Sequence, residues 1–392
     1  MGDLGNSCSA AGSCVCSPAD ELCSAPEACG PYGCCHPTDI TLNPALEFDP
    51  VEGRSAEVAP IDGDEFLIHY NTTGGVGVAA ILTVDTAAGT VSMGTPITVA
   101  DMPNYVYGAL ERVDQAHYLA AYNGEGDDGY AVVIEVAPAD HALSAGTPLE
   151  FDTVRGTRHA LAQIDGQRVL GIYNSSGAGE VVVFTVDGSD NSVSVSSPGV
   201  FDTMAESCTL AKVDPTHYLA AYRGPGPTGR ALVFEVDLST DEVSWGTPLE
   251  FEETNVNSNT LQQISAARFL LAYGDVGRVG QLRMLEVDTS TNGVSVVASH
   301  VFGPTQGDHA AIAPISGPDY LLAYRGDGDD GWVQVLTADA VTGAMSSSGD
   351  VEFEPTFLRH ITLHQIDPGH FLSTNEGPDL DGFARIFEPP CE

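Results

Sequence analysis

The sequence predicts an all-β fold built from seven copies of one unit, and three observations carry the prediction. Residues 214–222 almost repeat residues 114–122, and looser copies begin at residues 62, 165, 265, 316 and 367, so that copies start about 51 residues apart. Each complete copy holds four short runs of strand-forming residues. The last copy is one run short, and the start of the chain has one run to spare. A strand-rich repeat of this length indicates a radial or stacked array.

The four runs of one copy can be read directly. In the second copy they are residues 109–113, 118–122, 130–136 and 147–151. Valine, isoleucine, tyrosine and phenylalanine dominate them, and none has the length or the period of a helix. Turn signals lie between the runs, including Asp-x-Ser/Thr segments such as the one at Asp237, whose carboxylate we expect to bond nearby backbone groups.

Four antiparallel strands per copy, seven times, resemble a seven-bladed β-propeller, and the resemblance covers about residues 45–388. It implies that each four-stranded antiparallel blade packs both faces against its neighbours and that closing the ring removes the sheet edges. The Gly-His and Trp-Asp signatures of WD40 repeats and the paired glycines of kelch repeats are absent. The resemblance therefore concerns architecture, and no family active site is carried over.

The two ends of the repeat region predict how the ring closes. The seventh copy stops at residues 386–388 after three strands, whereas Pro-Ala-Leu-Glu-Phe-Asp at 44–49 matches the fourth run of the second copy. We expect the strand at 45–49 to complete the last blade. The expected domains are a cysteine-rich module at 1–40 and a propeller at 41–392.

Cysteine is concentrated at the N-terminus, which favours a disulfide framework in an oxidising compartment. Zinc is the alternative, but the spacing lacks two clean Cys-x2-Cys pairs. Closing the ring would bring Cys391 close to Cys34 and Cys35. The seven N-terminal cysteines are an odd number, and Cys391 makes it even. Cys208 is then expected to be a free thiol. A secreted protein needs a targeting segment, which we infer was removed or replaced by Met1. The expected disulfide cysteines are Cys8, Cys14, Cys16, Cys23, Cys29, Cys34, Cys35 and Cys391.

The net charge of −41 constrains the partners. Only 14 residues are basic, and Lys212 is the one lysine among them. So negative a surface repels nucleic acids and anionic lipids. No apolar run is long enough to span a membrane. The charge fits adaptation to salty water or simple solubility, and a dedicated cation-binding role is the alternative.

Two sets of loops are candidates for function. The loop between the second and third strands of a propeller blade lies on the same face of the ring as the loop that enters the first strand. Alternating acids and glycines in three of the former loops can wrap a hard cation such as calcium, although ordinary solvated hairpin loops explain them too. These aspartates are Asp127, Asp128, Asp327, Asp329, Asp330, Asp379 and Asp381.

The residues that enter the first strands vary from copy to copy, and we expect them to ring one mouth of the central channel. Three histidines among them could bind a transition metal or act as a base, but His159 is one position out of register with the other two, so a polar channel lining is the default. The candidate ligand-binding residues are Tyr107, Arg155, Arg158, His159, Glu206, Asn259, His309, Arg359 and His360, with Cys208 beside them.

Other recurrent residues are expected to be structural. His117, His217 and His370 fall at what we interpret as exposed hairpin positions. The tyrosine that ends each 114–122-like segment is interpreted as a blade-packing residue rather than part of a stacking platform.

The functional prediction is a secreted or cell-surface propeller that binds an extracellular glycan or protein, or builds a surface assembly, without catalysis. The competing prediction is an extracellular hydrolase or lyase that uses the mouth around Arg158, His159, His309, Arg359 and His360. A binder should show several similar shallow sites, and an enzyme one deep asymmetric pocket with a group of perturbed pKa. The loops differ between copies, which favours one unique site.

Overall fold

The computed structural model describes residues 40–101 and 106–389, with side chains for 40–100 and 108–389. It also describes five short strands near the N-terminus. These are β1 (Ser7–Cys8), β2 (Ser13–Cys16), β3 (Glu21–Ser24), β4 (Ala28–Gly30) and β5 (Gly33–Cys35). The predicted disulfide bonds of the N-terminal cysteines and Cys391 lie outside the described side chains, and the boundary at residue 41 stays a prediction.

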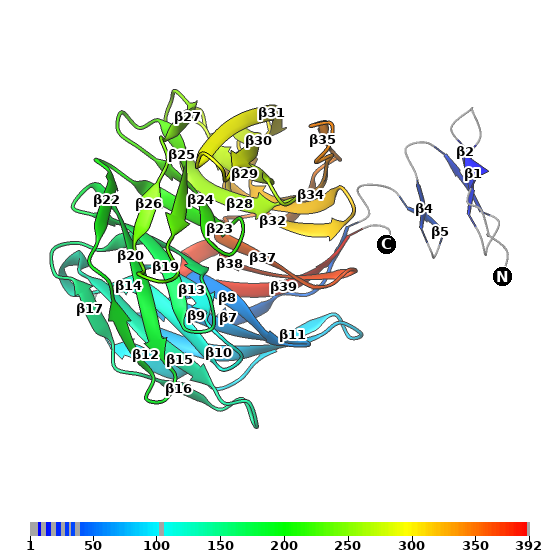
Figure 1. Ribbon diagram of the computed structural model, residues 1–392. Coiled ribbons are helices and arrows are strands. Elements are labelled where there is room, and N and C mark those ends of the chain that lie inside the picture. The colour runs from blue at the N-terminus through cyan, green and yellow to red at the C-terminus, as the bar shows by residue number, and fades with distance from the viewer. Residues whose placement is uncertain are drawn as a thin grey trace, which may run out of the picture.

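Seven antiparallel sheets follow one another around a ring, which confirms the seven-bladed β-propeller (Figure 1). We number the blades 1 to 7 in chain order. The innermost strands are β8 (Arg54–Asp62), β13 (Val106–Arg112), β18 (Thr157–Gln163), β23 (Glu206–Lys212), β28 (Asn257–Gln263), β32 (Asp308–Ser316) and β37 (Arg359–Asp367). The second strands are β9 (Glu65–Thr72), β14 (His117–Asn123), β19 (Arg168–Ser175), β24 (His217–Arg223), β29 (Arg268–Gly274), β33 (Asp319–Arg325) and β38 (His370–Glu376). The third strands are β10 (Val76–Asp85), β15 (Gly129–Val136), β20 (Ala178–Asp187), β25 (Gly229–Val236), β30 (Gly280–Asp288), β34 (Gly331–Ala338) and β39 (Gly382–Glu388).

The outer strand is continuous in blade 5 and split into two pieces in the other blades, a division the sequence prediction missed. In blade 2 the break falls at Gly146-Thr-Pro148, because proline lacks the N–H that a ladder needs. The outer strands are β11 (Thr90–Met93) and β12 (Ile97–Asp101), β16 (Leu143–Ala145) and β17 (Leu149–Asp152), β21 (Ser192–Val195) and β22 (Gly199–Asp202), β26 (Val243–Trp245) and β27 (Leu249–Glu252), β31 (Gly293–Gly303), and β35 (Met345–Ser347) and β36 (Val351–Glu354).

The ring closes as predicted, with the start of the chain supplying the outer strand of blade 7. β7 (Leu46–Asp49) pairs with β39, placing Leu46 opposite Ala384 and Asp49 opposite Gly382. β6 (Thr41–Leu42) extends the same edge, with Leu42 opposite Phe387. In Figure 1 the blue β7 accordingly lies beside the red β39. Backbone hydrogen bonds therefore attach the start of the chain, which leads directly into blade 1, to the last blade.

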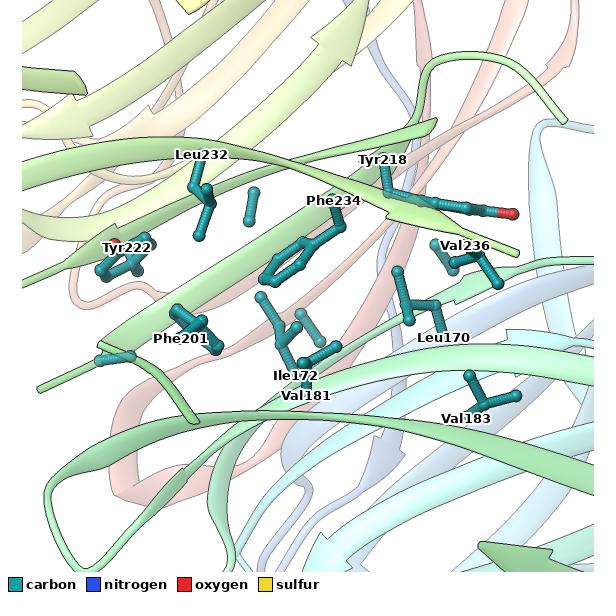
Figure 2. Packing of buried hydrophobic residues seen from close by; sticks show 14 of the residues in the cluster. Leu170, Ile172, Val181, Val183, Phe201, Tyr218, Tyr222, Leu232, Phe234 and Val236 are labelled. Carbon is teal, nitrogen blue, oxygen red and sulfur yellow. The ribbon is translucent and has the colours of Figure 1, made fainter. Parts of the chain in front are cut away.

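The hydrophobic core is divided among the interfaces between successive blades, and one aromatic contact repeats at five of them. A phenylalanine from an outer strand packs against the recurrent tyrosine of the next blade, as Phe201 does against Tyr222, with ring centroids 5.3 Å apart at 76° (Figure 2). The other pairs are Phe48–Tyr70, Phe151–Tyr173, Phe251–Tyr273 and Phe302–Tyr324. This agrees with the interpretation of the tyrosines as blade-packing residues.

Blade 7 departs from this pattern, as the pairing of its first two strands shows. Arg359 lies opposite Glu376, as Asp308 lies opposite Arg325 in blade 6, so the residue before Glu376 occupies the tyrosine position. That residue is Asn375. Asn375 is fully buried.

A second set of inter-blade contacts holds the inner strands near their C-terminal ends. Five long polar side chains at equivalent positions donate to a backbone carbonyl oxygen of the preceding blade. These are Arg112 to Ile61, Gln163 to Val113, Lys212 to Ile164, Gln263 to Val213 and Gln365 to Ile315. Pro60 and Pro314 occupy the same position in the two remaining blades and cannot donate.

Helix is confined to three single 3-10 turns in the described parts of the chain: η1 (Glu125–Asp127), η2 (Asp327–Asp329) and η3 (Pro378–Leu380). None of the helices seen there has the length and apolar character required to cross a membrane.

Candidate functional site at the channel mouth

Each inner strand begins with a β-bulge, and the bulges surround one end of the central channel. In blade 3 the register shifts between Thr157 and Ala160, and Arg158 takes a left-handed φ of 62°. The equivalent left-handed residues are Ser55, Ser207, Ser258, His309 and His360, with φ between 47° and 52°. A bulge turns side chains away from the alternation of a regular strand. The bulges therefore direct polar side chains toward the mouth.

The mouth contains a cavity of about 220 Å³. Arg158, His159, Asn259, His309 and His360 line it, so five of the predicted ligand-binding residues come together. A second hollow of about 340 Å³ shares several of these lining residues and extends along the inner strands as far as His364. Because they share these residues, the two hollows belong to one channel, whose lining is mixed polar and apolar along its length.

Three predicted site residues do not line this cavity. Arg155 is exposed on the loop before the bulge. Glu206 is held by an ion pair with Arg223, and Arg359 pairs with Glu376 beside the mouth. The side chain of Tyr107 lies outside the described residues.

The sequence prediction missed several lining residues. The main ones are Ser55, Ser207 and Ser258, which occupy the same bulge position as Arg158, and Glu57 and Thr362 below them. Aligning the copies residue by residue at the bulge could have found the serines. The same alignment would have singled out Glu57, because alanine or threonine occupies its position in the other blades.

The three mouth histidines have two different environments. His309 and His360 contact each other, with ring centroids 5.3 Å apart at 68°, whereas His159 stacks on Tyr173 at 6.1 Å. The predicted one-residue offset of His159 is confirmed, because the bulge residue of its blade is Arg158. The histidines therefore do not converge as one triad.

Burial and cationic neighbours keep the histidine pair uncharged. Burial lowers the pKa of His360 to about 4, and the guanidinium groups of Arg359, Arg158 and Arg325 act in the same direction. Burial lowers the pKa of His309 well below its ordinary value, with His360 as the next cause. At neutral pH both imidazoles are neutral and can each donate one hydrogen bond and accept one.

A carboxyl group and a thiol lie deeper in the channel. Burial raises the pKa of Glu57 to about 8, so this carboxyl is largely protonated at neutral pH. Burial raises the pKa of Cys208 to about 12, which outweighs the opposite effect of Arg158. Cys208 is a free thiol and, being protonated, a poor nucleophile.

The seven aspartates proposed to bind calcium lie in or beside the three 3-10 turns. Asp127, Asp329 and Asp379 have left-handed backbones there, and Asp329 accepts hydrogen bonds from Arg278 at 2.6 Å and Gln306 at 2.8 Å. The backbone oxygens of Asp127 and Asp329 also accept hydrogen bonds from the loops that enter the next blades. These contacts give the turns a structural role. Calcium binding there stays a prediction.

In the described residues, one group of three potential metal ligands has donor atoms within 4.8 Å of one another: Asp62, Glu65 and His141. It contains none of the seven aspartates. His141, in the loop before the outer strand of blade 2, contacts Glu65 in the β8–β9 hairpin of blade 1. The equivalent contact joins blades 4 and 3, where Asp241 in the loop before the outer strand accepts a hydrogen bond from Arg168. The equivalent placement identifies the group as a contact between adjacent blades.

The other recurrent histidines are structural, but two of them are not exposed as predicted. The side chains of His117 and His217 are each only 12% exposed, because they fold back onto an aspartate three residues earlier. The Nδ1 atom of His117 lies 2.9 Å from both carboxylate oxygens of Asp114. These hairpins are closed by side-chain contacts that composition alone does not reveal.

Comparison with known proteins gives the fold and no family. No protein-family model and no curated protein matched the chain. Among solved structures, the periplasmic gluconolactonase PpgL of Pseudomonas aeruginosa is 16% identical with a TM-score of 0.59, over 83% of this chain and 97% of that one. The BP39L lectin of Burkholderia pseudomallei is 10% identical with a TM-score of 0.62, over 87% and 99%. A protein from Lactobacillus plantarum is 17% identical with a TM-score of 0.60, over 83% and 92%. The likeness is one of fold.

Proposed function

We propose that the protein is a carbohydrate-binding propeller that takes a small sugar-derived ligand at the channel mouth. The main support is an asymmetric cavity at the mouth, which is built from positions at which the blades differ. Its lining combines neutral imidazoles, serine hydroxyls and the Asn259 amide, which suit a ligand rich in hydroxyl groups. The mouth hollow of about 220 Å³ continues into the hollow of about 340 Å³ beneath it, and this space suits a small ligand.

The fold neighbours support the same ligand class. One is described as a lectin and another as a gluconolactonase, and both names imply contact with sugars or sugar lactones. Identities of 10% and 16% carry no residue-level correspondence, so the argument for the site rests on its own geometry.

A second candidate function is hydrolysis of a sugar-derived substrate, and Glu57 is the observation that favours it. A carboxyl group that stays protonated at neutral pH beneath the mouth could serve as a general acid. The neutral imidazoles of His309 and His360 could hold the substrate above it. A substrate that binds and is then consumed would separate this candidate from simple binding.

The test is calorimetry with purified protein against a panel of monosaccharides, uronic acids and aldonolactones, followed by analysis of the recovered ligand. We expect saturable binding by at least one of them and its loss in His309→Ala and His360→Ala. Gln263→Ala, at the opposite end of the channel, is the matched control and should bind normally. The proposal would be contradicted if no ligand of the panel bound, or if neither histidine variant reduced the binding.

We also propose that the protein works outside the cell or at its surface, because the N-terminal cysteines suit disulfide bonds. Peptide mapping without reduction checks this: Cys391 should be bridged and Cys208 free. Cys391 unpaired with Cys208 bridged would overturn the pairing.

A further inference from the structure

The electrostatic character of the mouth differs from that of the molecule. The chain carries −41 with 14 basic residues. Half of those basic residues lie on the strand ends and loops of the mouth face: Arg54, Arg155, Arg158, Arg223, Arg278, Arg325 and Arg359. Three of them, from blades 3, 6 and 7, act together on the imidazole of His360. The charged groups that shift the pKa of His360 are these three cations, whereas His309 beside it is also influenced by the carboxylate of Asp308.

Carboxylates of this face form ion pairs with five of these arginines, and the longest of the contacts is that of Arg359: the paired residues are Arg54, Arg223, Arg278, Arg325 and Arg359. Asp308 accepts two hydrogen bonds of 2.8 Å from Arg325, and the pair is buried at the end of β33. Glu376 is also buried, but its Oε1 lies 3.7 Å from Nη1 of Arg359, beyond hydrogen-bonding distance. The side chain of Arg359 is 44% exposed. Because Arg359 lies beside the cavity and not in its lining, its exposed guanidinium would meet the part of a ligand that projects from the mouth.

Arg158 is the basic side chain that lines the cavity itself. Its bulge has a left-handed backbone, which is unfavourable for a residue with a Cβ. Serine occupies the same bulge in blades 1, 4 and 5, so the fold does not require arginine there. A guanidinium presents a planar fork of donors that matches a carboxylate or a phosphate.

We propose that the mouth contains an anion subsite, in which Arg158 from blade 3 and Arg359 from blade 7 hold a carboxylate or phosphate carried by the sugar-derived ligand. The inference deepens the proposed function and rests on it. The hydroxyl groups of the same ligand then face His309, His360 and Asn259. The negative surface around the mouth repels highly charged polymers, which leaves small anions as the ligands that can enter.

The test compares matched pairs of ligands that differ only in the charged group. D-glucuronate and glucose 6-phosphate are titrated against D-glucose, and D-galacturonate against D-galactose, at low and at physiological salt. We expect a charged member to bind at least tenfold more tightly than its neutral partner, with the preference shrinking as salt rises.

Variants of two nearby arginines locate the subsite. Arg158→Ser introduces the residue that three other blades carry in the same bulge, so it should fold normally, and it should reduce the charged preference to less than twofold. Arg155→Gln, three residues earlier and exposed outside the cavity, should leave the preference unchanged. Equal reductions in both variants would indicate a general field effect and overturn the subsite.

The outcomes separate this inference from the proposed function. Charged and neutral sugars that bind equally, or a preference that survives in Arg158→Ser, would overturn the anion subsite and leave carbohydrate binding standing. Absence of binding by every sugar in the panel would overturn both.

Discussion

Lys212 donates a hydrogen bond from Nζ to the carbonyl oxygen of Ile164, 2.9 Å away, across the interface between blades 4 and 3. It is the only lysine of the chain. Glutamine or arginine makes the same bond at four other interfaces. Folding takes the carbonyl oxygen of Ile164 partly out of water, and the bond from Lys212 replaces the lost hydrogen bond to solvent. Lys212 therefore belongs to the ring that holds the blades together at the end of the channel opposite the mouth.

Removing this bond should destabilise the fold without changing the mouth. Lys212→Met keeps the length of the side chain and leaves the Ile164 oxygen without its donor, so we expect a loss of about 1–2 kcal/mol in the free energy of unfolding. Denaturant unfolding measures it. Arg155→Gln, which is exposed, is the control; an unchanged unfolding midpoint in Lys212→Met would show that water satisfies the carbonyl.

Ring closure should depend on the absence of a side chain at Gly382. A Cβ there would lie 2.2 Å from Cε2 of Phe48, on the strand that closes blade 7. Gly382→Ala must displace that strand, and we expect a loss of about 2–4 kcal/mol. Gly166→Ala has open space around the new methyl group and should unfold like the parent protein. Equal midpoints for the two variants in thermal unfolding would contradict the packing argument.

Asp308 should stabilise the protein at neutral pH and lose this effect in acid. Burial alone would raise its pKa, but the hydrogen bonds from Arg325 and Arg278 outweigh it and lower the pKa to about 2. Because the folded pKa lies below the unfolded value of about 3.9, the contribution is complete above pH 4 and declines as the pH falls toward 2. Asp308→Asn should therefore cost about 2 kcal/mol or more at pH 6 and progressively less below pH 4.

Denaturant titrations of parent and variant between pH 6 and pH 3 follow this trend. Asp64→Asn, at an exposed hairpin position, is the control and should show little effect at any pH. A difference between parent and Asp308→Asn that stays constant with pH would mean that ionisation of Asp308 is not its cause.

Glu57 should have the opposite pH dependence. Its folded pKa of about 8 lies above the unfolded value, so the folded state keeps a proton that the unfolded state has released, and stability falls as the pH rises from about 4.5 to 8. Glu57→Gln removes this cost. We expect it to match the parent near pH 4 and to be more stable at pH 8, on the order of 2 kcal/mol because channel water moderates the penalty. A variant that is less stable at both pH values would disprove this.

Calcium binding by the acidic loops predicts a metal-dependent thermal midpoint. Adding calcium should raise the midpoint of protein first treated with a chelator, and Asp127→Asn combined with Asp128→Asn should weaken that response. Scanning calorimetry with and without chelator provides the measurement, with magnesium as the comparison cation. An identical midpoint in both conditions removes calcium as a structural ion.

The repeat made most of the scaffold predictable. The spacing of the 114–122-like segments predicts seven blades, and the mismatch between the chain ends predicts the strand from Leu46 to Asp49 that closes them. Both depend on local pattern and on the requirement that sheet edges be paired. The break in the outer strands was missed because the first piece, such as β16, is too short to stand out from a turn.

The candidate site was predictable only in part. Arg158, His309 and His360 could be placed at the mouth because they precede inner strands. The serines beside them and Glu57 would have appeared only in an alignment of the copies at the bulge, and the residues of other blades that surround them could not be read from it.

What the sequence determined by itself is the number of blades, their order and the strand that joins the two chain ends, because these follow from short-range periodicity repeated around a ring. The tertiary structure decided the chemistry. Burial made Glu57 a retained acid and His360 a neutral imidazole, and the bulges brought Arg158 into a mouth shared with arginines of distant blades. A pKa and a local potential depend on desolvation and on charges nearby in space, and separation along the chain specifies neither.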